Sequence, residues 1–183
     1  GAAIAGPKSR DMLSKLYPDL DVSNDALPFM GYKEAEFFGV PSRIFRISFS
    51  GELAYEINVK SDHGMFMWEK MMEVGKEFGN QPYGTEALST LRIEMGHVAG
   101  PELDGRTIPS DVSLNGLVSK KKDFIGKNSL GREAFNVESR QKIVGLIPID
   151  RKSSIPEGSH IVQDQNAKLP NPKLGHVSSS CWR

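Results

Sequence analysis

The sequence has a single cysteine, no long apolar run and no excess of charge of either sign. With only Cys181, the chain can form no internal disulfide and no cysteine-rich zinc site, which favours a reducing, cytoplasmic location. Lysine plus arginine and aspartate plus glutamate both number 23, so no positive field attracts nucleic acid. No apolar stretch approaches the roughly 20 residues that cross a bilayer. These absences predict a soluble globular protein that binds neither nucleic acid nor a membrane.

Several motifs of catalysis and nucleotide binding are also missing. The chain has no G-x-G-x-x-G or Walker-type loop, no H-E-x-x-H and no G-x-S-x-G elbow. Its four histidines are scattered, and no two of them have the spacing of metal ligands. We therefore expect no metal centre and no redox step within this chain, and the pattern assigns no catalytic residue.

Residues 1–139 have the pattern of an α+β domain, in which helices pack on an antiparallel sheet. Apolar residues alternate over 32–59 with turn residues between the runs, which predicts a three-stranded meander. The stripe of Met65, Trp68 and Met71 is typical of a helix face that packs in a core, rather than of a ligand groove. The expected elements are a strand in 1–6, a helix in 7–18, three strands in 32–59, and helices in 61–79 and 85–95.

The residue composition of the chain changes twice after the last of these helices. Glycine, proline and turn residues punctuate 97–126, which predicts a long structured loop with little regular structure. Short strand-like runs from about 140 onward predict a second domain, 140–183, that is an incomplete small β-barrel. The chain begins without methionine and ends directly after a β-rich run, so we expect a piece of a longer protein.

The segment RISFSGELAYEINV, residues 46–59, places Glu52 at a break between strand-like runs. A carboxylate there must face water or accept hydrogen bonds, because an unpaired buried charge costs several kcal/mol. Its two coplanar oxygens match the paired N–H donors of a 2-aminopyrimidinone edge, such as that of a pterin. Phe45, Phe49 and Tyr55 lie within one strand length and offer a face for stacking. Both interpretations, solvent and ligand, remain open at this point.

Five segments in the same order resemble one enzyme family. SFSGELAYEI is similar to the T-G-E-x-G-Y-E-I segment of the aminomethyltransferases, the glycine-cleavage T-proteins and their relatives. YGTEALSTLRIEMGH resembles that family's helix ending in L-R-x-E-x-G, and GPKSRDML and PFMGY resemble segments upstream. GHVAGPELDGRT and KKDFIG resemble the C-terminal part of the α subunits of heterotetrameric sarcosine oxidases. Together these segments cover nearly the whole chain.

This resemblance implies part of a folate-binding fold, with tetrahydrofolate as the cofactor of this chain. The resemblance implies that Glu52 binds the pterin, that Phe45 stacks on it and that Tyr55 makes a further contact. It also implies that a one-carbon unit from oxidative demethylation of sarcosine is captured as 5,10-methylenetetrahydrofolate. FAD, FMN and NAD are then expected elsewhere in the parent complex, and the partners are the other subunits.

The chain departs from the T-protein pattern in one helix. Ala87 and Leu88 stand where T-proteins carry an arginine, and the family's catalytic acid lies upstream of the residues present here. A free-standing aminomethyl or methyl transferase and a non-catalytic scaffold of the same fold remain alternatives. A further set of charged residues fits either an acid, base or clamp role or a buried ion pair joining helix to loop: Arg92, Glu94, Asp104 and Arg106.

Overall fold

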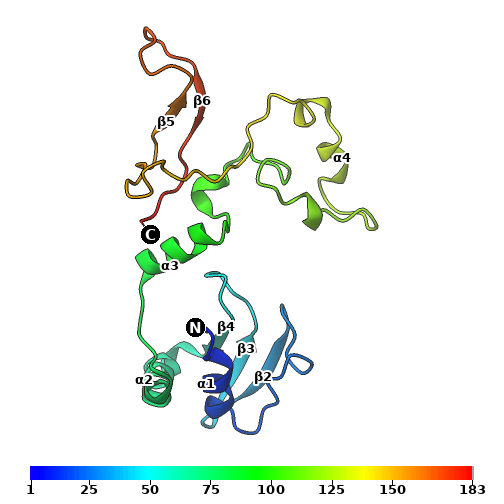
Figure 1. The fold of residues 1–183 in the computed structure, drawn as a ribbon. Coiled ribbons are helices and arrows are strands. Elements are labelled where there is room, and N and C mark those ends of the chain that lie inside the picture. The colour runs from blue at the N-terminus through cyan, green and yellow to red at the C-terminus, as the bar shows by residue number, and fades with distance from the viewer. Residues whose placement is uncertain (183) are drawn as a thin grey trace. The chain divides into compact units, whose positions relative to one another are not determined.

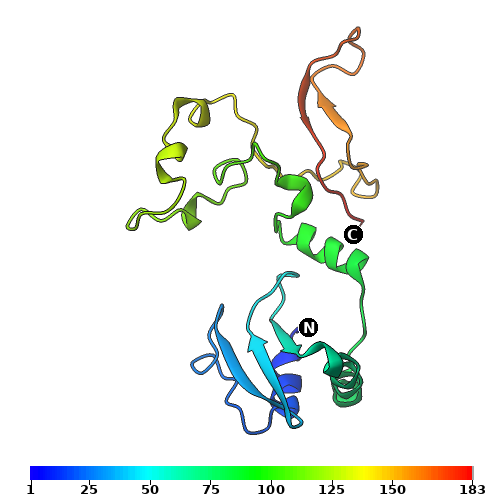
Figure 2. The same cartoon turned by 180° about the vertical axis from the view of Figure 1, so that it is seen from behind.

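The computed structural model describes residues 1–182 and consists of two compact units (Figure 1; Figure 2 shows the opposite side). The first unit is Gly1–His97, and the second begins at Val98. The division falls at the start of the irregular segment expected for 97–126, whereas the domain boundary near residue 140 stays a prediction. Within residues 1–182, no helix is long and apolar enough to cross a lipid bilayer.

The first unit is built on a four-stranded antiparallel sheet. Its strands are β1 (Ala2–Ala5), β2 (Tyr32–Phe37), β3 (Val40–Phe45) and β4 (Ala54–Val59), in the order β1-β4-β3-β2. The meander of β2, β3 and β4 confirms the prediction from the alternating pattern. Strand β3 ends earlier than the pattern suggested, and the intervening residues form a loop, which we call the Glu52 loop (residues 46–53).

Three α-helices complete the first unit. They are α1 (Ser9–Leu16), α2 (Gly64–Gly75) and α3 (Thr85–Glu94); the 3₁₀ turns η1 (Ser61–His63) and η2 (Lys76–Phe78) flank α2. The helices were expected at these places. The predicted stripe on α2 is confirmed at Met71, which is buried, and wrong at Met65 and Trp68, which are exposed, while Met67 lies in the core instead.

One face of the sheet forms the core with α1 and α2. In the antiparallel register Ile4 lies opposite Tyr55, and Ile44 lies opposite Ile57, so all four side chains point to the same face. They pack against apolar residues of the two helices, including Leu13, Leu16, Met67 and Met71. The other face carries the alternate residues of each strand, and on β2 these are exposed: Tyr32, Glu34 and Glu36.

The second unit contains little regular structure, as expected for 97–126. Its short elements are η3 (Gly100–Glu102), η4 (Asn115–Leu117), α4 (Lys127–Leu130), η5 (Glu133–Phe135) and the antiparallel hairpin of β5 (His160–Val162) and β6 (Lys173–His176). Residues 142–150, one of the strand-like runs expected from about 140 onward, form no strand. The Ile143 N–H donates to the Asp111 carbonyl oxygen at 2.7 Å, but no ladder of backbone hydrogen bonds continues from it among the described residues, and Ile147 and Ile149 are exposed.

Candidate functional site

The backbone around Glu52 is held on both sides. Gly51 has φ +83°, a conformation that L side chains rarely adopt, and its N–H donates to Ser48 Oγ at 3.0 Å. On the other side, the carbonyl oxygen of Leu53 accepts from Ser9 Oγ at 2.9 Å and from the Gly6 N–H at 2.9 Å. These contacts tie the Glu52 loop to the region between β1 and α1, so the position of Glu52 is fixed by its neighbours.

The Glu52 side chain itself is exposed. Its carboxylate forms no hydrogen bond and no ion pair with any residue in the described part of the chain, 1–182. Both oxygens are therefore accessible as acceptors. The structure places Glu52 on a bend, as the sequence indicated, and its side chain is paired with no other group in the part of the chain that the structure describes.

Phe45 lies at the end of β3, on the sheet face that points away from the core. It pairs with Glu56 across the strands, and its half-buried ring stacks on Tyr32, with ring centroids 5.8 Å apart and an interplanar angle of 24°. The Tyr32 side chain is 62% exposed. The two rings therefore form an aromatic platform on the open face.

Tyr55 lies on the opposite face of the sheet, inside the core. Its side chain is 0% exposed, and its hydroxyl oxygen is buried without a hydrogen-bond partner among the described residues. The Arg10 guanidinium lies 5.8 Å from its ring centroid. Burial raises the pKa of Tyr55, and the charges of Arg10 and Arg46 oppose this rise. The structure thus brings neither Glu52 nor Phe45 onto the same surface as Tyr55.

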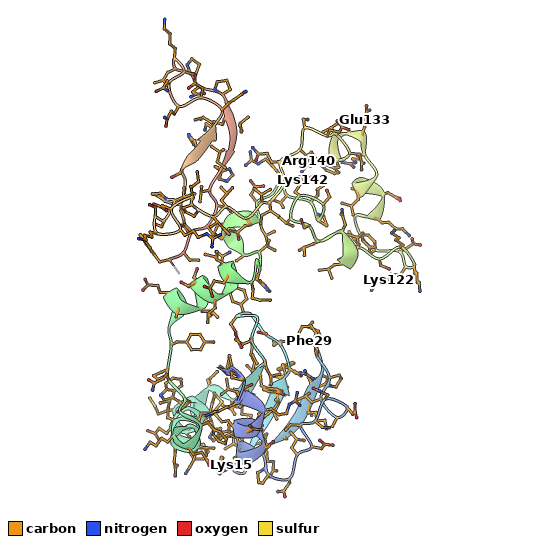
Figure 3. All side chains as sticks on the ribbon, viewed as in Figure 1. Lys15, Phe29, Lys122, Glu133, Arg140 and Lys142 are labelled. Carbon is orange, nitrogen blue, oxygen red and sulfur yellow. The ribbon has the colours of Figure 1, made fainter. Side chains whose placement is uncertain are left out.

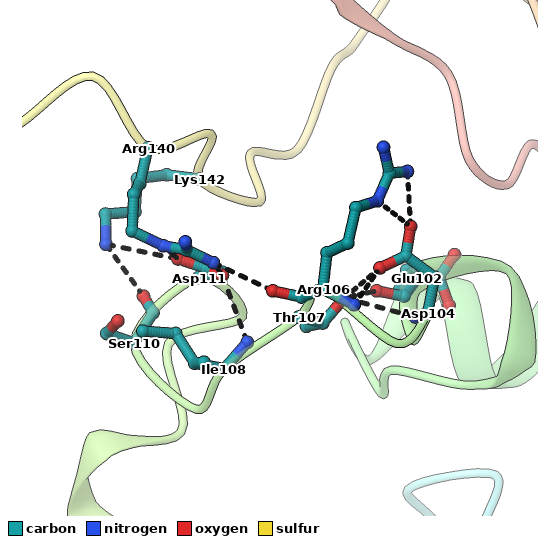
Figure 4. Close-up of polar contacts among 9 residues, drawn as sticks. All are labelled: Glu102, Asp104, Arg106, Thr107, Ile108, Ser110, Asp111, Arg140 and Lys142. Atoms are coloured by element: carbon teal, nitrogen blue, oxygen red, sulfur yellow. Dashed lines mark hydrogen bonds and ion pairs between the residues drawn. The ribbon is translucent and has the colours of Figure 1, made fainter. Parts of the chain in front are cut away.

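The charged residues that follow α3 form two clusters in the second unit, which one hydrogen bond to the Arg106 backbone connects (Figure 4). In the first, Arg106 Nε donates to Asp104 Oδ2 at 3.0 Å, and this hydrogen bond holds the pKa of Asp104 at about 2. Both side chains are largely exposed, so this pair is a local turn contact and not the buried ion pair considered from the sequence. Arg92 lies in the first unit, where its Nη1 donates to the carbonyl oxygen of His97 at 3.4 Å.

Sequence reasoning missed the second cluster, which is more buried. Arg140 Nε donates to Asp111 Oδ1 at 2.9 Å, and Arg140 Nη2 also contacts Asp111 Oδ2. The same Nη2 donates to the Arg106 carbonyl oxygen at 2.9 Å, and Lys142 Nζ lies 3.7 Å from Asp111 Oδ1. The pairing of Asp111 with a residue 29 positions away leaves no local sequence signal. This cluster closes the base of the loop 111–140.

A cavity of about 430 Å³ lies along the loop that this cluster closes. Its lining is mostly apolar and includes Leu103, Ile108, Val112, Leu117 and Phe124, together with Lys122. In Figure 3, Lys122 lies at the far end of the loop from Arg140 and Lys142. None of Glu52, Phe45 and Tyr55 lines the cavity.

Comparison with known proteins gives consistent matches along the chain. Residues 1–122 match the family model described as the GCVT N-terminal domain. The sarcosine oxidase subunit alpha of Corynebacterium sp. (strain P-1) is 43% identical over 182 residues, which cover 97% of this chain and 19% of that protein. The corresponding subunit of Rhizobium meliloti (strain 1021) is 43% identical over 183 residues, covering 98% of this chain and 18% of that protein.

A more distant relative covers the same residues. The aminomethyltransferase of Chloroherpeton thalassium is 34% identical over 179 residues, which cover 97% of this chain and 46% of that protein. The chain therefore spans less than a fifth of the alpha subunits that it matches, and less than half of this transferase.

Proposed function

The chain belongs to the GCVT N-terminal domain family, and from that premise we propose that it is the tetrahydrofolate-binding part of a sarcosine oxidase alpha subunit. In the parent enzyme, the one-carbon unit released by oxidative demethylation of sarcosine is captured as 5,10-methylenetetrahydrofolate. This chain contributes binding and orientation of the folate, which lower the entropic barrier of the capture step. The redox chemistry belongs to other parts of the parent.

This proposal rests on the contacts of Glu52. Its backbone is held by Ser48 on one side and through Leu53 on the other, whereas its carboxylate has no partner among the described residues. A preorganised acceptor pair of this kind binds without first breaking an internal ion pair. Each charge-assisted hydrogen bond from a pterin N–H to a carboxylate oxygen contributes roughly 1.5–3 kcal/mol.

We assign Glu52 and Phe45 to one end of a folate. Glu52 supplies the acceptors for the pterin edge, and Phe45 supplies an aromatic face that already stacks on Tyr32. Tyr55 supports β4 from the core side and is assigned no ligand contact in this arrangement. Tetrahydrofolate, when bound, supplies the nitrogen atoms that carry the one-carbon unit.

We extend the proposal to the organisation of the parent protein. The hairpin of β5 and β6 is the start of a small β-barrel domain that begins near residue 140, and residues 1–139 belong to the folate-binding domain. FAD, FMN and NAD bind elsewhere in a cytoplasmic complex with other subunits. Limited proteolysis of the full-length protein tests the boundary, because cleavage is expected within the exposed residues 136–139 if the division is correct.

Titration of the full-length protein with tetrahydrofolate tests the main proposal. Glu52→Ala is expected to weaken binding at least tenfold, because two charge-assisted hydrogen bonds are lost. Glu36→Ala is the matched control, since Glu36 is also an exposed glutamate of the first unit but lies on β2. Equal affinity of wild type and Glu52→Ala would contradict the role of Glu52.

A scaffold without folate binding is the second candidate. It is favoured by the placement of Phe45 and Tyr55 on opposite faces of the sheet, which prevents them from enclosing one ligand. The same titration separates the two functions. A correctly folded full-length protein that does not bind tetrahydrofolate would support the scaffold and reject the folate site.

A further inference from the structure

The end of α3 packs directly on the Glu52 loop. The side chain of Met95 fills the space beside Gly51 that a Cβ atom would need: an ideal Cβ there would overlap Met95 Cγ and lie 2.5 Å from its Sδ. A Cβ at position 51 would require the Met95 side chain to shift, and the φ of +83° at this position also favours glycine. The residue immediately before Glu52 is therefore in contact with α3.

A second contact joins the same two segments. The rings of Phe49 and His97 lie with their centroids 4.8 Å apart and their planes at 56°. Phe49 belongs to the Glu52 loop, and His97 follows α3 by three residues. Two side chains of one segment, Met95 and His97, thus contact two residues of the other, on the N-terminal side of Glu52.

Backbone hydrogen bonds hold the C-terminal end of α3. The N–H of His97 donates to the Arg92 carbonyl oxygen at 2.8 Å, and the N–H of Gly96 donates to that of Ile93 at 2.9 Å. The Arg92 side chain is 5% exposed and donates back to the His97 carbonyl oxygen. These hydrogen bonds fix the direction in which the chain leaves α3, and therefore the positions of Met95 and His97.

We propose that the end of α3, through Met95 and His97, is a positioning element that holds Glu52 in the orientation needed to bind its ligand. This inference rests on the proposed folate function, since it concerns the same carboxylate. Met95 and His97 are positioning residues: they contact Gly51 and Phe49, not the ligand. The carboxylate of Glu52 has no partner among residues 1–182, so its orientation depends on the backbone contacts of its loop.

A double-mutant cycle in the full-length protein tests the proposal, with the dissociation constant of tetrahydrofolate as the readout. Met95→Ala is combined with Glu52→Gln, which keeps one acceptor oxygen so that binding remains measurable. If Met95 acts through Glu52, Met95→Ala weakens binding about tenfold in the wild type and has little further effect in Glu52→Gln. Met95→Leu, which preserves most of the apolar volume, is expected to retain wild-type affinity.

The matched control is Met65→Ala. Met65 is also an exposed methionine on a helix of the first unit, at 69% exposure against 60% for Met95, but it lies on α2. Its removal is expected to leave affinity unchanged. If Met95→Ala does not fold, Phe49→Leu takes its place in the cycle, because it removes the ring contact with His97 while keeping an apolar side chain.

The outcomes separate this inference from the proposed function. Equal loss of affinity from Met95→Ala in both backgrounds, or no loss in either, would overturn the positioning role while Glu52 remains a ligand residue. If Glu52→Gln and Glu52→Ala bind like the wild type, the folate function of Glu52 fails and the positioning role fails with it. Both the positioning role and the folate function are supported if Met95→Ala weakens binding only in the wild-type background and Met95→Leu keeps wild-type affinity.

Discussion

Phe45 and Tyr55 lie on opposite faces of one antiparallel sheet. Phe45 of β3 pairs with Glu56 of β4. Tyr55, the residue before Glu56, points to the other face and pairs with Ile4 over the core. One flat ligand cannot contact both rings without passing through the sheet. Of these two aromatic residues, Phe45 is therefore the one that lies on the open face, and Tyr55 is buried in the core.

Phe45→Ala in the full-length protein should weaken tetrahydrofolate binding by about three- to tenfold. An aromatic stacking contact contributes about 0.5–1.5 kcal/mol beyond the buried area, and alanine removes it. Titration measures the change, and Phe45→Tyr is the control, because it keeps the ring face. Unchanged affinity in Phe45→Ala would show that the platform of Phe45 and Tyr32 does not contact the folate.

Tyr55→Phe should leave folate binding unchanged and raise the free energy of unfolding by roughly 1 kcal/mol. The Tyr55 hydroxyl is buried without a hydrogen-bond partner in residues 1–182, and an unsatisfied buried polar group costs about 1–3 kcal/mol. Denaturant unfolding measures the change. A loss of stability would mean that the hydroxyl has a partner in the full-length protein, and a loss of folate affinity would place Tyr55 at the ligand.

The sequence predicted the meander of β2, β3 and β4, though not the pairing of β1 with β4, because the signals of a meander are local. Alternation over 32–59 and the turn residues between the runs specify the meander, and the register then follows from which face is apolar. The phase of the buried stripe on α2 was less certain from the pattern alone. Methionines occur on both sides of this helix, and tertiary packing selected Met67 rather than Met65 for the core.

Contacts between residues that are far apart in the chain could not be predicted from the sequence. The contact of Met95 with Gly51 and the ion pair of Asp111 with Arg140 join residues 44 and 29 positions apart, and nothing in the neighbourhood of either pair indicates its partner. Likewise, proximity in sequence suggested that Tyr55 could reach a ligand bound at Glu52. The two-residue period of the strand decides the face, and it places Tyr55 in the core.

We expect the wild type to lose stability between pH 10 and pH 12, and Tyr17→Phe should remove this loss. Burial raises the pKa of Tyr17 from 10.0 to about 12, although its hydrogen bond with Ser42 acts in the other direction. The folded state therefore retains the proton that the unfolded state loses, so this contribution is complete below pH 10 and disappears as the pH rises towards 12. Unfolding followed as a function of pH measures it.

The same substitution has a second, pH-independent effect. Tyr17 donates a hydrogen bond of 3.0 Å to Ser42 Oγ, which in turn donates to the Ala35 carbonyl oxygen at 2.8 Å. Loss of the first bond should cost about 1 kcal/mol at pH 7. Ser42→Ala is the matched variant, because it removes the acceptor and leaves the tyrosine. An alkaline stability loss that persists in Tyr17→Phe would assign the effect to another group.

Asp111→Asn should make the loop 111–140 open more easily near neutral pH and have little effect near pH 2. The hydrogen bond from Arg140 is the largest cause that lowers the pKa of Asp111 from 3.8 to about 2. The folded state then binds fewer protons than the unfolded state between these values, so the stabilisation is complete above about pH 4 and is lost as the pH falls towards 2. The shift corresponds to at most about 2 kcal/mol.

Hydrogen exchange of the full-length protein between pH 2 and pH 7 measures this local opening. Asp104→Asn is the matched control: Arg106 also lowers the pKa of Asp104 to about 2, but the Asp104 side chain is 50% exposed against 12% for Asp111. An exposed ion pair contributes little because water screens it, so Asp104→Asn should leave the exchange of residues 111–140 unchanged. If both variants open the loop equally, burial of the Asp111–Arg140 pair is not what closes it.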